Sequence, residues 1–194
     1  MSRDGKDFAK FLFCLGILEG KAFQLYGRIS EKVESPHAKF SLLYIAYDCL
    51  KNSVILGELS KSLARPEVKD KDYGKILGDV WKIVENLSKE VLKLESIDKK
   101  KFLSLSNKLI SIYTITLAEL KTLGFMSKEI SAAYNVDLEN LKDILELVIE
   151  DEETDTQVLM SMRDSRAGRG RGAVGNLPEV KYVNPEAWNR SETG

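Results

Sequence analysis

The apolar residues of this chain recur with the spacing of an α-helix in segment after segment, and this pattern limits the fold more than any other feature. Over residues 5–33 they alternate at intervals of four and three, as one face of a helix requires. The same spacing returns over 36–64, 71–94, 98–124 and 138–163, and no alternating β-branched run bounded by hairpin turns is present. The sequence therefore predicts an all-α fold, an antiparallel bundle of about five long helices.

Residues 36–64 carry two apolar stripes. The first holds Phe40, Leu43, Tyr47, Leu50 and Val54, and the second holds Leu42, Ile45, Cys49, Asn52, Leu56, Leu59 and Leu63. A helix that is apolar on two sides packs between neighbours, so we expect this helix at the centre of the bundle. Ser35-Pro36 predicts where it begins, and Gly57 suggests a close approach by a neighbouring helix.

Length and composition indicate a cytoplasmic protein. The 194 residues suffice for one domain and an appendage. The net charge of −1 gives no overall attraction for nucleic acid or membrane, so any such partner would have to bind at a local charged patch. No signal peptide and no apolar run long enough to span a membrane is present, so we expect no membrane partner. Cys14 and Cys49 favour reduced, buried thiols, with a bridge between them as the alternative. The high charge and low glutamine content is typical of thermophile proteins.

Three carboxylates fall on the predicted core seams. Glu19 lies on the stripe of the first helix, and Glu152 and Asp155 lie on the stripe of the last one. The last stripe is otherwise made of Leu141, Leu145, Val148, Leu159 and Met162. Charged side chains are rarely buried without a partner, so these positions are candidates for a site.

Two stretches resemble the ferritin-like, rubrerythrin-type superfamily. LEGKAFQLYGRISEKVESP is similar to its first helix, and LKDILELVIEDEETDTQVL is similar to its last ligand helix. The resemblance implies a helical bundle around a carboxylate-rich metal site. It gives Glu19 and Glu152 the roles of ligands, with Asp155 in the place of a histidine. Cys49 and Asn52 occupy the positions of the other Glu-x-x-His, and Tyr113 or Thr116 lies on the remaining ligand seam.

The candidate metal ligands are therefore Glu19, Cys49, Asn52, Glu152 and Asp155. We expect no resident cofactor, with iron or manganese at these residues as the alternative. The competing interpretation is structural: the carboxylates bond to neighbours, and Asn52 satisfies a hydrogen bond in the core. No G-x-S-x-G, phosphate-binding glycine loop or C-x-x-C is present, so catalysis of those classes has no support.

The composition changes after Arg163. We divide the chain into a helical bundle domain, 1–163, and a flexible tail containing Gly, Arg and Pro, 164–194. The tail follows Arg163 with Arg166, Arg169 and Arg171 in RAGRGRG, a composition that often binds RNA, and then offers Tyr182 and Trp188 as aromatic anchors for a partner. The alternatives are a solvated linker and a segment that folds back on the bundle.

From the sequence we expect a non-catalytic adaptor or regulatory factor. Its tail would dock on a larger protein or ribonucleoprotein assembly, with the bundle as scaffold. The alternative is a ferritin-like metalloprotein that handles iron or peroxide, and a third hypothesis is a homo-oligomer joined through exposed helix faces.

Overall fold

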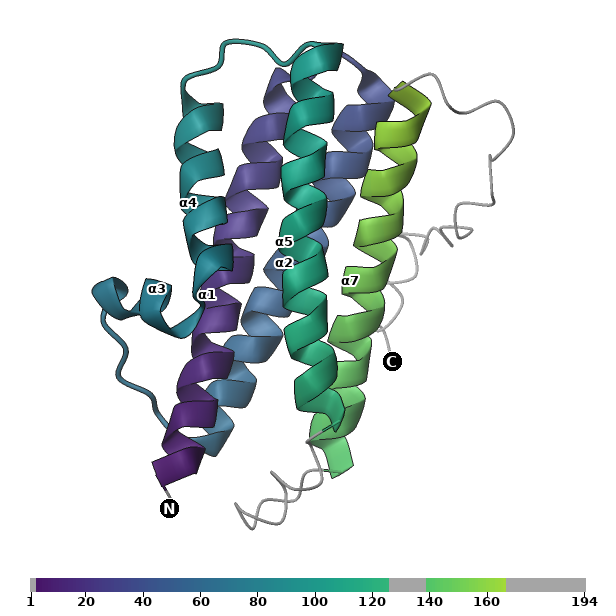
Figure 1. Ribbon diagram of the computed structural model, residues 1–194. Helices are drawn as coiled ribbons and strands as arrows, with labels where there is room; N and C mark the ends of the chain where they lie inside the picture. The colour runs from purple at the N-terminus through teal and green to yellow at the C-terminus, as the bar shows by residue number, and fades with distance from the viewer. Residues whose placement is uncertain (1–2, 126–138, 167–194) are drawn as a thin grey trace, which may run out of the picture.

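The chain is helical throughout the part described by the computed structural model, residues 3–125 and 139–166 (Figure 1). Its elements are α1 (Arg3–Lys32), α2 (Pro36–Leu63), the 3₁₀ turn η1 (Asp70–Asp72), α3 (Tyr73–Ile76), α4 (Asp79–Leu92), α5 (Lys99–Phe125) and α7 (Glu139–Arg166). These residues form no strand; an isolated bridge joins Val33 to Ile97. The all-α expectation is confirmed.

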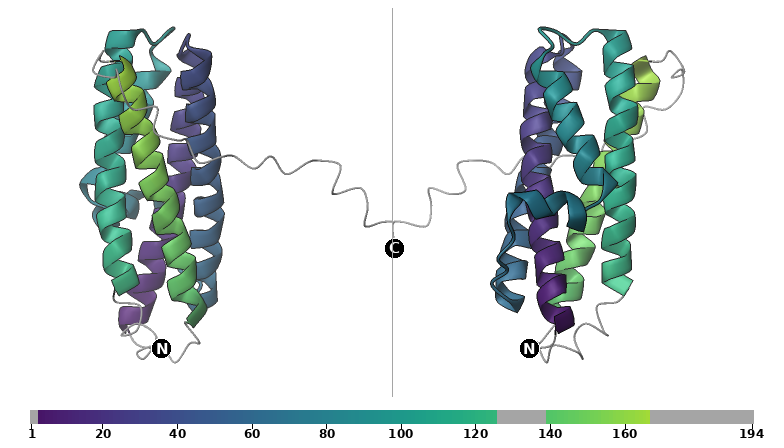
Figure 2. Two further views of the ribbon diagram at one scale, coloured as in Figure 1. Left: turned by 90° about the vertical axis from the view of Figure 1, so that its right-hand side faces the viewer. Right: turned by 60° about the vertical axis from the view of Figure 1, so that its left-hand side comes forward.

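The long helices lie side by side as a bundle (Figures 1 and 2). Helices α1 and α2 form one extensively packed antiparallel pair, and α5 and α7 form another. Helix α2 also packs against α7, while α4 packs against α1 and α5. None of the helices in the described ranges is long and apolar enough to cross a membrane.

Local signals set the helix ends that the sequence predicts. Ser35 caps α2, accepting a hydrogen bond from the Ala38 amide at 3.4 Å, and Pro36 occupies the first helical position. Asp98 caps α5 in the same way, accepting from the Lys101 amide at 2.7 Å.

The single helix predicted over 71–94 is wrong. This segment is divided into η1, α3 and α4. The break between α3 and α4 lies at Gly78, which adopts a φ of 62°, a left-handed conformation that glycine reaches without strain. Across this bend the Tyr73 ring packs against the Trp81 ring, with centroids 5.0 Å apart and the ring planes inclined at 60°. The Lys21 ammonium of α1 lies 4.6 Å from the Trp81 ring centre and ties the bend to the bundle.

The central position predicted for α2 is also wrong. Its second stripe is buried, but three residues of the first, Phe40, Tyr47 and Val54, are 69%, 65% and 59% exposed. Among the described elements, α1 and α7 are the helices that pack against α2, and they cover only its inner side (Figure 2). Periodicity shows that a face is apolar, but it does not show that another helix covers that face.

The close approach expected at Gly57 occurs, but it depends on a different glycine. A Cβ atom on Gly57 would meet nothing within 4 Å. A Cβ on Gly16 of α1 would lie 3.0 Å from the Ser53 carbonyl oxygen and 3.2 Å from the Gly57 backbone nitrogen. Gly16 is therefore the residue that lets α1 and α2 come together.

Cys14 and Cys49 are both buried and unbridged, as expected for reduced thiols. The last helix continues to Arg166, three residues beyond the predicted end of the bundle domain. Residues 126–138, between α5 and α7, and the predicted tail from residue 167 onward lie outside the described residues.

Candidate functional site

The candidate ligands meet in the interior of the bundle. Glu19 comes from α1, Cys49 and Asn52 from α2, and Glu152 and Asp155 from α7. All five side chains are buried, with exposed fractions between 0% and 4%. The helical period places them there, because each lies on the inner stripe of its helix with apolar residues one turn away.

Tyr113 of α5 completes this arrangement, which we call the carboxylate cluster: Glu19, Cys49, Asn52, Tyr113, Glu152 and Asp155. The Tyr113 hydroxyl donates a hydrogen bond to Asp155 Oδ2 at 3.0 Å and lies 3.2 Å from Cys49 Sγ. One connected path thus runs from α2 through α5 to α7, and the Cys49 thiol also lies close enough to the Glu19 carboxyl to oppose the rise of its pKa.

A second contact in the cluster is looser. Asn52 Nδ2 donates to Glu152 Oε1 at 3.5 Å, at the outer limit for a hydrogen bond. The structural role expected for Asn52, a satisfied core hydrogen bond, is therefore only half fulfilled, because Asn52 Oδ1 has no partner.

Several buried oxygen atoms of the cluster lack a hydrogen-bond partner among the residues that the structure describes. They are Glu19 Oε2, Asn52 Oδ1, Glu152 Oε2 and Asp155 Oδ1. The neighbouring Tyr26, whose ring centroid is 5.9 Å from that of Tyr113, also has an unpartnered hydroxyl oxygen. Each unpaired buried polar group costs about 1–3 kcal/mol, so such a concentration opposes folding unless something else satisfies these atoms.

Within residues 3–125 and 139–166, no side-chain cation forms an ion pair with the carboxylates of the cluster. The ion pairs formed by the described residues leave out Glu19, Glu152 and Asp155. Burial, which disfavours a negative charge, raises the pKa of Glu19 to about 7 and that of Asp155 to about 8. Burial and the nearby Glu19 carboxylate also place the pKa of Glu152 well above its ordinary value.

An ion-pair network lies next to the cluster and uses the residues that precede Asn52 on α2 and Glu152 on α7. Lys51, next to Asn52, lies 2.9 Å from Asp48 and 2.9 Å from Asp151, which adjoins Glu152. This network joins α2 to α7 beside the weak Asn52–Glu152 contact. The sequence analysis did not predict this network. The spacing of Asp48 and Lys51, three residues apart on one helix, could have indicated it.

The described side chains do not form a ready-made metal centre, since no group of three or more His, Cys, Asp or Glu among them is arranged to hold an ion. One hydrogen bond gives a reason, because it orients the Asp155 carboxylate towards Tyr113. The structure therefore brings the predicted residues together in the interior, and their role as metal ligands stays a prediction.

No protein family, characterised protein or solved structure matches this chain. The argument for function therefore depends on the residues themselves.

The predicted tail site falls mostly outside the described residues. Arg163 lies in the last turn of α7, where its Nε is 2.9 Å from Asp164 Oδ1, and Arg166 ends the helix. The remaining predicted tail residues, Arg169, Arg171, Tyr182 and Trp188, lie beyond it.

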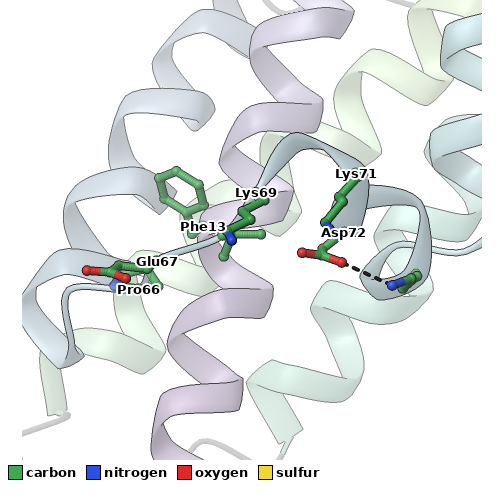
Figure 3. Close-up of a pocket in the computed structure, with 8 residues that line it drawn as sticks. Phe13, Pro66, Glu67, Lys69, Lys71 and Asp72 are labelled. Atoms are coloured by element: carbon green, nitrogen blue, oxygen red, sulfur yellow. Dashed lines mark hydrogen bonds and ion pairs between the residues drawn. The ribbon is translucent and has the colours of Figure 1, made fainter.

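A surface depression of about 650 Å³ lies apart from the carboxylate cluster (Figure 3). It is lined by Phe13 of α1, by the 66–69 loop and by residues of η1 and α3. Two acidic residues line it, Glu67 and Asp72, and Asp72 is paired with Lys75 at 3.1 Å. The depression includes no cluster residue, so it gives no entrance to the buried site.

Proposed function

We propose that the protein binds a hard divalent cation, such as Mn²⁺ or Fe²⁺, in the core of the bundle. The residues that would hold it are Glu19, Asn52, Glu152 and Asp155. The observation that carries this proposal is that each of these four buried side chains has an oxygen atom without a partner.

The donor set supports a hard cation over a histidine-dependent iron centre. Carboxylate and amide oxygens suit Mg²⁺, Ca²⁺ and Mn²⁺ and also accept Fe²⁺, whereas the two motif histidines of the ferritin-like pattern are replaced by Asn52 and Asp155. The Cys49 thiol, held neutral by a pKa raised well above its ordinary value, is a poor ligand as it stands. A ferritin-like topology belongs to the same proposal. It is supported by the meeting of the candidate residues from α1, α2 and α7 beside Tyr113 of α5.

Cation binding would compete with protons. Ligand carboxyls must lose their protons to bind a metal, and those of this cluster hold them tightly. Binding should therefore strengthen between about pH 6 and 8 and release protons into solution.

The test is elemental analysis of the purified full-length protein after incubation with Mn²⁺, or with Fe²⁺ without oxygen. We expect near-stoichiometric metal in the wild type and loss of metal in Glu19→Gln/Glu152→Gln, which keeps the side-chain shape and removes two charges. Glu119→Gln is the matched control, because Glu119 on α5 is half-buried and burial also raises its carboxyl pKa. Trace metal in the wild type, or equal metal in the cluster variant, would overturn the proposal.

One observation favours a second function, the non-catalytic adaptor. Arg163, Arg166, Arg169 and Arg171 lie within nine residues among glycines, a composition that suits contacts with phosphates and unpaired bases. In this proposal the segment that begins at Arg163 docks on a larger assembly containing RNA.

The adaptor proposal predicts binding of a fluorescent single-stranded oligoribonucleotide, weakened by salt. Arg169→Ala/Arg171→Ala should reduce the affinity. Lys75→Ala/Lys82→Ala removes the same charge from the exposed surface of the bundle and should leave binding unchanged. Equal affinities for the two variants would contradict a role for the tail.

A further inference from the structure

The outer side of α2 presents a mostly apolar surface, interrupted by the exposed Lys51, which pairs with Asp48 and Asp151. We call it the outer stripe: Phe40, Tyr44, Tyr47, Leu50 and Val54, which are 69%, 45%, 65%, 38% and 59% exposed. These are five of the nine large apolar side chains exposed in the described residues, and they lie within four turns of one helix face. The other four, Leu92, Phe125, Leu147 and Met160, are scattered over α4, α5 and α7.

The spacing of the outer stripe is that of a helix–helix seam. Phe40, Tyr47 and Val54 follow one another at intervals of seven, with Tyr44 and Leu50 between them. A seven-residue repeat of apolar side chains keeps one face turned towards a partner helix. On α1 the half-buried Phe23 ring lies 6.3 Å from that of Tyr47 and extends the surface sideways.

Exposed charges flank the stripe in an order that selects its partner. Glu34 and Lys39 lie at its N-terminal end, and Glu58 and Lys61 at its C-terminal end; all four are exposed. If two copies of α2 pack antiparallel about Tyr47, with Phe40 opposite Val54 of the second copy, Glu34 comes close to Lys61 of the second copy. A parallel pair would place like charges together. The charges therefore complement a second copy of the same helix in one direction.

The area also fits a moderate self-association. At roughly 150–250 Å² for each aromatic ring and somewhat less for Leu and Val, the exposed fractions amount to about 500 Å² per copy. Two copies would thus bury about 1,000 Å² from the stripes alone, close to the lower limit for specific interfaces, before Phe23 and the flanking charges are included.

We infer that the protein forms a twofold homodimer in which the outer stripes of two copies pack antiparallel, with Tyr47 near the axis. Phe40 of each copy then lies against Val54 of the other, and Tyr44 against Leu50. The surface left uncovered by the bundle is the dimer interface.

The test is light scattering coupled to size exclusion of the full-length protein over a range of concentrations. We expect a dimer for the wild type and a monomer for Tyr47→Lys. The control Leu147→Lys, a similar change at an exposed leucine of α7, should stay dimeric. A wild type that is monomeric throughout, or a Tyr47→Lys variant that stays dimeric, would overturn the inference.

Charge reversal tests the direction of packing. Glu34→Lys and Lys61→Glu should each weaken the dimer several-fold, and the double variant should restore it, because the reversed pair attracts again. Absence of rescue would contradict the antiparallel register. Deletion of residues 167–194 separates the remaining alternative: a monomeric full-length protein that dimerises only after truncation would mean that the tail occupies the stripe, and would also overturn the inference.

Discussion

Each side of α2 holds residues that its surroundings disfavour: polar groups lie on the buried side, and apolar groups lie on the exposed side. The inner side places Cys49 and Asn52 in an interior with unpaired oxygens and three buried carboxylates, whereas the outer side places aromatic rings in water. Burying polar groups and exposing apolar ones both cost stability, and a helix selected only for folding would do the reverse. The comparison teaches that each side is incomplete in the isolated chain, the inner one in charge and the outer one in apolar contact.

The largest effect is expected on the inner side of α2, where the free energy of unfolding should depend on pH. The pKa of Asp155 rises from 3.8 to about 8 in the folded protein, so the native state holds a proton that the unfolded chain has lost. The contribution of Asp155 to the free energy of unfolding is therefore fully present below about pH 4. It is lost as the pH rises to about 8, a decline on the order of 5 kcal/mol. Urea unfolding should show this decline in the wild type relative to Asp155→Asn. Parallel pH profiles for the two proteins would contradict it.

The same titration also bears on cation binding. If a hard cation occupies the cluster, adding Mn²⁺ at pH 8 should recover much of the stability lost by the wild type and none in Glu19→Gln/Glu152→Gln.

A smaller effect is expected where α2 meets α1. Gly16→Ala places a Cβ 3.0 Å from the Ser53 carbonyl oxygen, and the forced separation of the two backbones should cost about 1–3 kcal/mol. Gly57→Ala adds the same atom on the open side of α2, where nothing lies within 4 Å, and should stabilise by up to about 1 kcal/mol through helix propensity. Denaturation midpoints of the two variants should move in opposite directions; a shift in the same direction would refute this account of the contact.

The smallest effect is expected on the outer side. Phe40 is 69% exposed, so Phe40→Gln should change the unfolding free energy of the single chain by less than about 0.5 kcal/mol. The measurement belongs at protein concentrations below those that favour self-association. A cost of several kcal/mol under those conditions would show that Phe40 is covered within its own chain.

The sequence predicted what local and periodic signals determine. Ser35 and Asp98 cap the helices that follow them, and the seam positions of Glu19, Glu152 and Asp155 placed all three in the interior. It did not predict the break at Gly78, because the apolar spacing continues across it while the backbone turns. The hydrogen bond from Tyr113 to Asp155 was equally out of reach, since it depends on how α5 and α7 are aligned along their length. The tail residues and the ferritin-like assignment stay predictions.

The bend at Gly78 also gives the molecule an optical reporter. By turning the chain back, it places Trp81 between the Tyr73 ring and the Lys21 ammonium, at the junction of α1, α3 and α4. The sequence has one other tryptophan, Trp188, in the predicted tail. With Trp188 replaced by Phe, the emission wavelength of Trp81 would follow the detachment of α4 from α1. Unfolding that begins at this junction could then be distinguished from unfolding that begins at the buried carboxylates.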